Sequence, residues 1–136
     1  MRPELDQKLC EKYPEIFVDR NSSINRTAMC WGFSHGDGWY EIIDALCGLI
    51  MWHCTQNLHL KPDGKPLRIP KATQVKEKYG TLSFYIDHAD EPVYNFIQFA
   101  ESMSARVCEE CGAPAKLQGK GWYYTACEAH TKEEEK

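Results

Sequence analysis

Two closely spaced ligand pairs near the end of the chain constrain its fold more than any other feature. The four residues are Cys108, Cys111, Cys127 and His130, with the spacing C-x2-C-x15-C-x2-H. A two-residue gap lets a tight turn direct two side chains at one ion, and a tetrahedron of such ligands suits zinc. The spacing therefore predicts a zinc ribbon over residues 108–130. Because all four positions are protein ligands, we expect the zinc to be structural and not catalytic.

A short hairpin is expected between the two ligand pairs. Residues 115–118 and 122–125 have the character of strands, and the glycine-rich segment 119–121 supplies a turn between them. A hairpin of this size has little core, so metal binding should provide most of its stability. The following residues, 131–136, are expected to form an acidic tail.

The apolar pattern of residues 1–107 predicts one α+β domain in which helices pack on a small antiparallel sheet. Apolar residues recur at helical spacing in some segments and alternate in others. The expected elements are a helix from Pro3, a helix over 39–53 capped by Asp37, a loop over 57–70, a hairpin of strands 72–78 and 81–86, and a helix capped by Asp90. Because this last helix leads directly into Cys108, we expect the ribbon to be rigidly attached.

Composition and charge narrow the classes of function. The chain of 136 residues has 16 Lys and Arg against 20 Asp and Glu, a net charge of −4. An acidic chain is a poor non-specific binder of nucleic acid. Seven cysteines, an odd number, fit a reducing compartment better than a disulfide framework. No apolar run approaches the roughly 18 residues that cross a bilayer. We therefore expect a cytoplasmic protein with no membrane partner.

Three motifs carry a resemblance to a known group of proteins. They are G-D-G-W at 36–39, K-E-K-Y-G-T-L-S-F-Y at 76–85 and the cysteine–histidine segment 108–130. In this order they resemble small uncharacterised proteins encoded by bacteriophages and prophages, over most of the chain from Tyr13 to His130. The resemblance implies a protein made in the cytoplasm of an infected bacterium, and it assigns no catalytic residue.

We expect the chain to act by binding and not as an enzyme. It has no nucleophile elbow, no H-E-x-x-H helix and no phosphate-binding loop of the Walker type. The primary hypothesis is a zinc-binding, phage-encoded inhibitor of a host protein or ribonucleoprotein complex, similar to an anti-defence or anti-CRISPR protein. An acidic surface would be steered towards a basic groove on such a target.

Two alternative hypotheses remain open at this point. Basic and aromatic side chains on the ribbon would suit nucleic acid. The glycine-rich turn at 36–39, together with lysines of the predicted hairpin, would suit a small anionic signalling ligand. The candidate ligand- or partner-binding residues are His35, Asp37, Trp39, Lys76, Lys78, Lys120, Trp122 and Tyr123.

Overall fold

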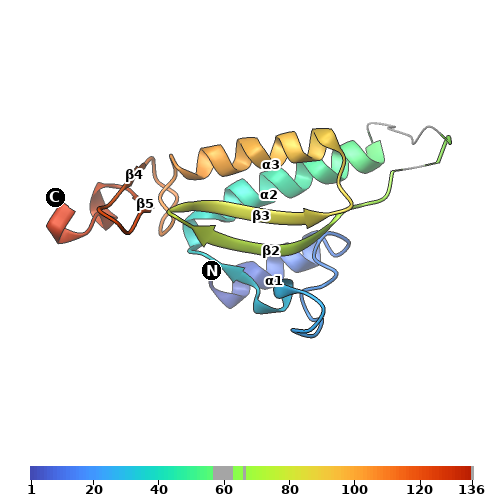
Figure 1. Ribbon diagram of the computed structural model, residues 1–136, viewed down its shortest axis with the longest axis horizontal. Coiled ribbons are helices and arrows are strands. Elements are labelled where there is room, and N and C mark those ends of the chain that lie inside the picture. Colours follow the sequence, from blue (N-terminus) through green and yellow to red (C-terminus); the bar gives the residue numbers. More distant parts are fainter. Residues whose placement is uncertain (57–62, 66, 136) are drawn as a thin grey trace.

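The computed structural model describes residues 1–56, 63–65 and 67–135 and shows a mixed α/β chain (Figure 1). Its α-helices are α1 (Pro3–Lys12), α2 (Tyr40–Met51) and α3 (Glu91–Ser104). Its strands are β1 (Phe33–Ser34), β2 (Lys71–Lys78), β3 (Thr81–Asp87), β4 (Lys116–Gln118) and β5 (Tyr124–Ala126). The combination of helices with small sheets confirms the predicted class. None of the helices described is both long and apolar enough to cross a membrane.

The larger sheet has the strand order β1-β2-β3 and is mixed, so the prediction of a purely antiparallel sheet is wrong. Strands β2 and β3 are antiparallel, whereas β1 runs parallel to β2 with Phe33 opposite Val75. The chain between β1 and β2 includes α2, which is the long connection that a parallel pair needs. With only two residues, β1 is too short to produce a strand pattern in the sequence.

The β2–β3 hairpin is confirmed, and its turn lies at the predicted residues. Tyr79 and Gly80 both have positive φ, at 53° and 89°, which is the combination of a type I′ turn. Leu82 and Phe84 of β3 are buried, whereas Tyr85 is exposed. Two side chains of α3 accept hydrogen bonds from backbone N–H groups of β3 that point away from β2. Ser104 Oγ accepts from Leu82 at 2.8 Å, and Glu101 Oε2 accepts from Phe84 at 2.9 Å.

Helices α2 and α3 lie alongside each other along the β2–β3 hairpin (Figure 1). The buried face of α2 contains the residues expected from their helical spacing. These are Ile43, Leu46, Cys47 and Ile50. The α-helix ends at Met51 and continues as a π-helical turn over Trp52–Gln56, so it is slightly shorter than predicted. Residues 57–62 and 66 of the predicted loop lie outside the described residues.

The two predicted helix caps have different outcomes. The side chain of Asp90 accepts the N–H of Val93 at 3.3 Å and caps α3 as expected. Asp37 does not cap α2, because it lies inside a 3₁₀ turn (Asp37–Trp39) that precedes the helix. Its Oδ1 instead accepts the N–H of Arg2 at 2.8 Å. Asp37 therefore lies at a helix start as predicted, but its carboxylate binds Arg2 and not the N–H groups of the helix.

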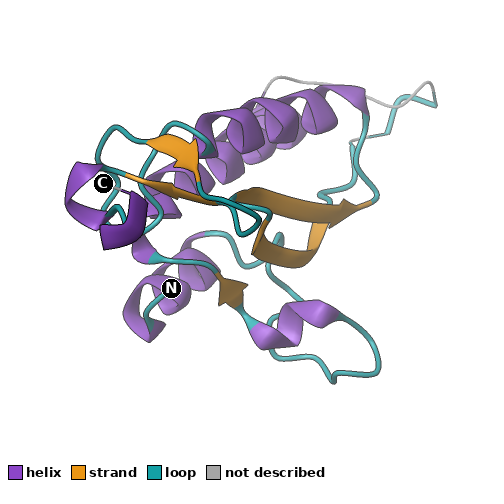
Figure 2. Cartoon of the chain, turned by 60° about the vertical axis from the view of Figure 1, so that its left-hand side comes forward, coloured by secondary structure: helices purple, strands orange, loops and turns teal. Residues whose placement is uncertain are grey.

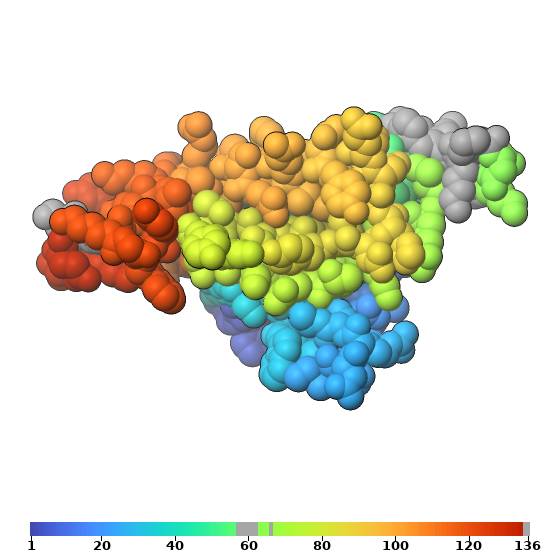
Figure 3. Space-filling view, in the orientation of Figure 1, coloured from blue at the N-terminus to red at the C-terminus, as the bar shows by residue number. Residues whose placement is uncertain are grey.

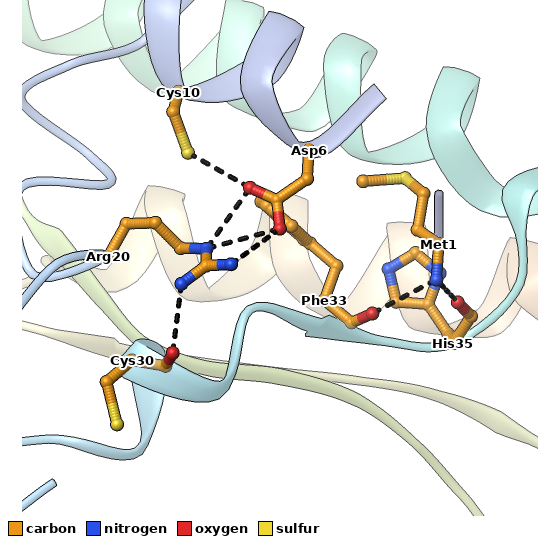
Figure 4. A network of polar contacts seen from close by, with 7 residues as sticks. All are labelled: Met1, Asp6, Cys10, Arg20, Cys30, Phe33 and His35. Carbon is orange, nitrogen blue, oxygen red and sulfur yellow. Dashed lines mark hydrogen bonds and ion pairs between the residues drawn. The ribbon is translucent and has the colours of Figure 1, made fainter. Parts of the chain in front are cut away.

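A polar network joins helix α1 and the residues before it to residues 20–35 (Figure 4). Arg20 Nη2 lies 3.0 Å from Asp6 Oδ2, and Arg20 Nη1 donates to the carbonyl of Cys30 at 2.9 Å. The Met1 amino group donates to the carbonyls of Phe33 and His35. These contacts hold the start of the chain against β1 and the turn that follows it.

Candidate metal centre

The side chains of the two ligand pairs converge at one point. Their four donor atoms all lie within 4.8 Å of one another. Cys111 Sγ is 3.7 Å from Cys127 Sγ, and His130 Nδ1 lies 3.3 Å from Cys127 Sγ and 3.5 Å from Cys108 Sγ. A tetrahedral site with metal–sulfur bonds of about 2.3 Å has sulfur–sulfur separations of about 3.8 Å. The observed separations match this geometry, so the cluster could hold a metal ion.

Local backbone geometry brings the first ligand pair together. Gly112 has a φ of 83°, a left-handed conformation in which other residues are strained. The chain reverses here, because the N–H of Gly112 donates to the carbonyl of Cys108 at 2.9 Å. The N–H of Cys108 in turn donates to the carbonyl of Ala113 at 2.8 Å. The turn therefore holds both cysteines of the first pair on one side.

The antiparallel β4–β5 hairpin supplies the second pair (Figure 2). Cys127 follows β5 directly, and His130 ends a 3₁₀ turn (Glu128–His130). Strand β5 begins two residues later than predicted. Gly119 and Gly121 both have positive φ, so a longer connection replaces the expected tight turn. Trp122 and Tyr123 lie in this connection and not in a strand.

The contact between Cys127 and His130 favours their charged forms. Interaction with His130 lowers the pKa of the Cys127 thiol to about 6. The same contact with Cys127 is the largest of the influences that raise the pKa of His130. A thiol with a lowered pKa is largely thiolate at neutral pH, and the thiolate is the form that binds metal. Among the described residues, this cluster is the candidate metal centre.

The loop that carries Cys108 and Cys111, called the metal loop below, contacts the glycine-rich turn that precedes α2. The N–H of Gly38 donates to the carbonyl of Glu109 at 2.7 Å, and the N–H of Gly36 donates to Glu109 Oε2 at 2.9 Å. Trp39 Nε1 donates to the carbonyl of Val107 at 2.8 Å. A Cβ atom at Gly38 would lie 1.9 Å from the carbonyl oxygen of Cys108. Glycine is therefore required at this close approach of two backbones.

A second contact joins the β4–β5 hairpin to the β2–β3 turn. Thr125 Oγ1 donates to the carbonyl of Gly80 at 2.7 Å, and Thr125 is buried. The N–H of Glu109 donates to the carbonyl of Thr125 at 3.2 Å. One β5 residue thus contacts both the metal loop and the larger sheet, so the metal centre is held at two sides.

Three of the candidate binding residues are buried or bound to other residues within the fold. Trp39 is fully buried, and Asp37 is bound to Arg2. His35 is buried, and burial is the main cause that lowers its pKa to about 4. The N–H groups of the 36–39 turn that an anionic ligand would use already bind Glu109. The remaining candidates reach the surface at least in part: Lys76, Lys78, Lys120, Trp122 and Tyr123.

Sequence reasoning missed an apolar groove between α2 and α3. Its volume is about 290 Å³. Phe99, of which 68% is exposed, lies at this groove with Leu49. The sequence of α2 could have indicated this groove, because the helix is apolar on nearly all sides. Ala45 and Leu49 lie outside its buried face. The lining residues are Glu41, Ile42, Ala45, Leu46, Leu49, Phe96, Phe99, Ala100 and Met103.

No protein-family model, curated protein or solved structure matches this chain significantly. What the chain does must therefore follow from its own residues and contacts.

Proposed function

We propose that the chain is a zinc-binding, phage-encoded protein that inhibits a host protein complex by binding to it. The donor set supports zinc, because three thiolates and one imidazole in a tetrahedron suit this metal. The four ligands leave no position for water or substrate, so the zinc would stabilise a zinc ribbon and would not catalyse a reaction. Phage origin and cytoplasmic location rest on the resemblance of the three sequence motifs.

The α2–α3 groove is the observation that carries the binding function. Of the residues that line this groove, only Glu41 is charged. Depletion of charge with enrichment of aromatic residues and methionine is typical of the centre of a protein–protein interface. Phe96, Phe99 and Met103 provide this composition on α3. A partner protein is therefore the occupant that the groove favours.

The proposal is tested in bacteria whose defence system restricts a phage. Wild-type chain should restore plaque formation and should co-purify with a stoichiometric host protein complex. Phe99→Glu places a charge in the groove and should lower the recovery of that complex at least tenfold, which is about 1.4 kcal/mol. Tyr94→Glu is the matched control, because Tyr94 is an exposed aromatic residue of α3 that does not line the groove.

Two results would contradict the proposal. One is the absence of any stoichiometric protein on the wild-type chain in cells where plaques are restored. The other is equal recovery of the complex by Phe99→Glu and Tyr94→Glu, which would separate the inhibition from the groove.

A further inference from the structure

The turn between β2 and β3 contains an aromatic residue in an unfavourable backbone conformation. Tyr79 has a φ of 53°, where glycine and asparagine are favoured and a bulky side chain is strained. Its side chain is 76% exposed, so the fold recovers little packing energy from it. Strained residues that the fold does not need are typical of binding sites. Tyr79 is therefore better explained by contact with a ligand than by stability.

More exposed aromatic residues lie beside this turn. Gly80 touches the β4–β5 hairpin, since a Cβ atom there would lie 3.0 Å from the backbone of Tyr123. Trp122, the preceding residue, is 74% exposed, and Tyr123 is half exposed. Figure 3 shows the β2–β3 turn in yellow-green against the orange-red hairpin. Three aromatic side chains are thus presented at one junction, where two separate sheets meet.

Lysines accompany these aromatic residues, and the carboxylates of Glu77 and Glu109 accept backbone N–H groups. Lys78 Nζ lies 5.7 Å from the centre of the Tyr79 ring, and Lys120 is exposed in the hairpin connection. The carboxylate of Glu77 accepts the N–H of Gly80 at 2.7 Å. That of Glu109 accepts the N–H of Gly36, as described above. The tip surface, as defined next, contains three lysines and no carboxylate. We define it as Lys76, Lys78, Tyr79, Lys120, Trp122 and Tyr123.

We propose that the tip surface binds single-stranded nucleic acid. Aromatic side chains stack on unpaired bases without selecting their sequence, and lysines neutralise the phosphates between them. The inference deepens the proposed function, on which it rests for its biological role. The tip surface would contact a nucleic acid strand that the host complex holds, while the α2–α3 groove contacts its protein.

A protein partner fits the tip surface less well. Protein interfaces are enriched in arginine and depleted of lysine at their centres. The charged residues of the tip surface are the three lysines, with no arginine among its six members. Lysine acts as a point charge that suits phosphate, and each exposed ring offers a face of the size of a base.

The experiment measures binding of the zinc-loaded full chain to fluorescein-labelled oligo-dT and oligo-U by fluorescence anisotropy. Binding to both is expected, because stacking does not distinguish sequence. Three lysines predict that the logarithm of the association constant falls with the logarithm of salt concentration, with a slope of about −2. Trp122→Ala should weaken binding about tenfold. Tyr79→Asn should do the same while it leaves thermal stability equal or higher, because asparagine suits the turn.

Trp31→Ala is the matched control, because Trp31 is 65% exposed and lies outside the tip surface. Its affinity should equal that of the wild type. The proposal is overturned if the wild type shows no binding up to about 100 µM at low salt. It is also overturned if Trp31→Ala weakens binding as much as Trp122→Ala does.

Failure of this inference can be told apart from failure of the proposed function. If the host complex is retained but oligonucleotides do not bind, the proposed inhibitor function is supported and nucleic-acid binding by the tip surface is contradicted. If Trp122→Ala then releases the complex after nuclease treatment, the tip surface contacts protein. If oligonucleotides bind but no host complex is retained, the tip inference stands and the inhibitor falls.

Discussion

At the scale of single residues, His35 is a histidine buried among aromatic rings. Its imidazole is 6% exposed and lies between the rings of Phe33 and Trp39, at 6.0 and 5.6 Å. Nδ1 is 2.7 Å from the carbonyl of Gly36, whereas Nε2 has no hydrogen-bond partner among the described residues. Burial therefore holds the ring in its neutral form and lowers its pKa from 6.5 to about 4.

This lowered pKa predicts that acid destabilises the fold. The unfolded chain binds a proton near pH 6.5 and the folded chain only near pH 4, so stability is lost as pH falls through this range. The loss due to His35 should be about 2 kcal/mol at pH 5 relative to pH 8. Urea unfolding of wild type and His35→Gln at both values measures it. Both proteins keep the four metal ligands, so proton competition at the cysteines cancels. Equal losses in the two proteins would show that His35 is not responsible.

A second prediction at this scale concerns Gly38. Gly38→Ala should reduce the free energy of unfolding by about 2–4 kcal/mol, because its Cβ atom would overlap the carbonyl oxygen of Cys108. Backbone atoms cannot rotate away, so the metal loop must move. Gly48→Ala is the control, since a Cβ atom there meets only Tyr13 Oη at 3.6 Å and alanine is the better helix former. It should be neutral or stabilising. A Gly38→Ala protein as stable as Gly48→Ala would rule out the close approach.

At the scale of elements, the β4–β5 hairpin should depend on the metal. Its strands have three residues each, and both Leu117 and Trp122 are exposed, so packing alone provides little stability. Cys127→Ser, or removal of the metal with a chelator, should abolish the protection of amides in residues 108–130 from hydrogen exchange. The core of α2 should stay protected.

Metal analysis accompanies this measurement. One zinc per chain is expected for the wild type and for Cys30→Ser, which loses a cysteine outside the cluster. Cys127→Ser should retain far less. Unchanged protection of the hairpin in the metal-free protein would mean that its contacts with Gly80 and Glu109 suffice.

The elements that could be predicted from the sequence are those defined by local pattern. Strand β3 alternates between buried and more exposed residues, α3 has a capping aspartate, and the cysteine and histidine spacing predicts that four ligands come together. The elements that could not be predicted depend on distant partners. Strand β1 exists only because β2 lies beside it, and Asp37 binds Arg2, which lies 35 residues earlier in the sequence. The groove was missed because burial cannot be told from partner binding when a helix is apolar on all sides.

At the scale of the whole molecule, charge and apolar surface are separated. The whole chain has a net charge of −4, whereas the six residues of the tip surface include three lysines and no carboxylate. The apolar groove lies between helices, away from the lysines of the tip. Two partners of different chemistry could therefore be bound at the same time. Phe99→Glu and Trp122→Ala should affect different partners, which is why their effects in the experiments above can be separated.

The outer edge of β3 has a consequence for the behaviour of the protein at high concentration. An unpaired strand edge is a template on which a second chain can add a strand and begin a fibril. Here the hydroxyl of Ser104 and the carboxylate of Glu101 already accept the N–H groups of Leu82 and Phe84. An incoming strand would have to displace both and leave a half-buried carboxylate without its donor. This edge of the sheet is thus protected from edge-to-edge aggregation when the protein is concentrated.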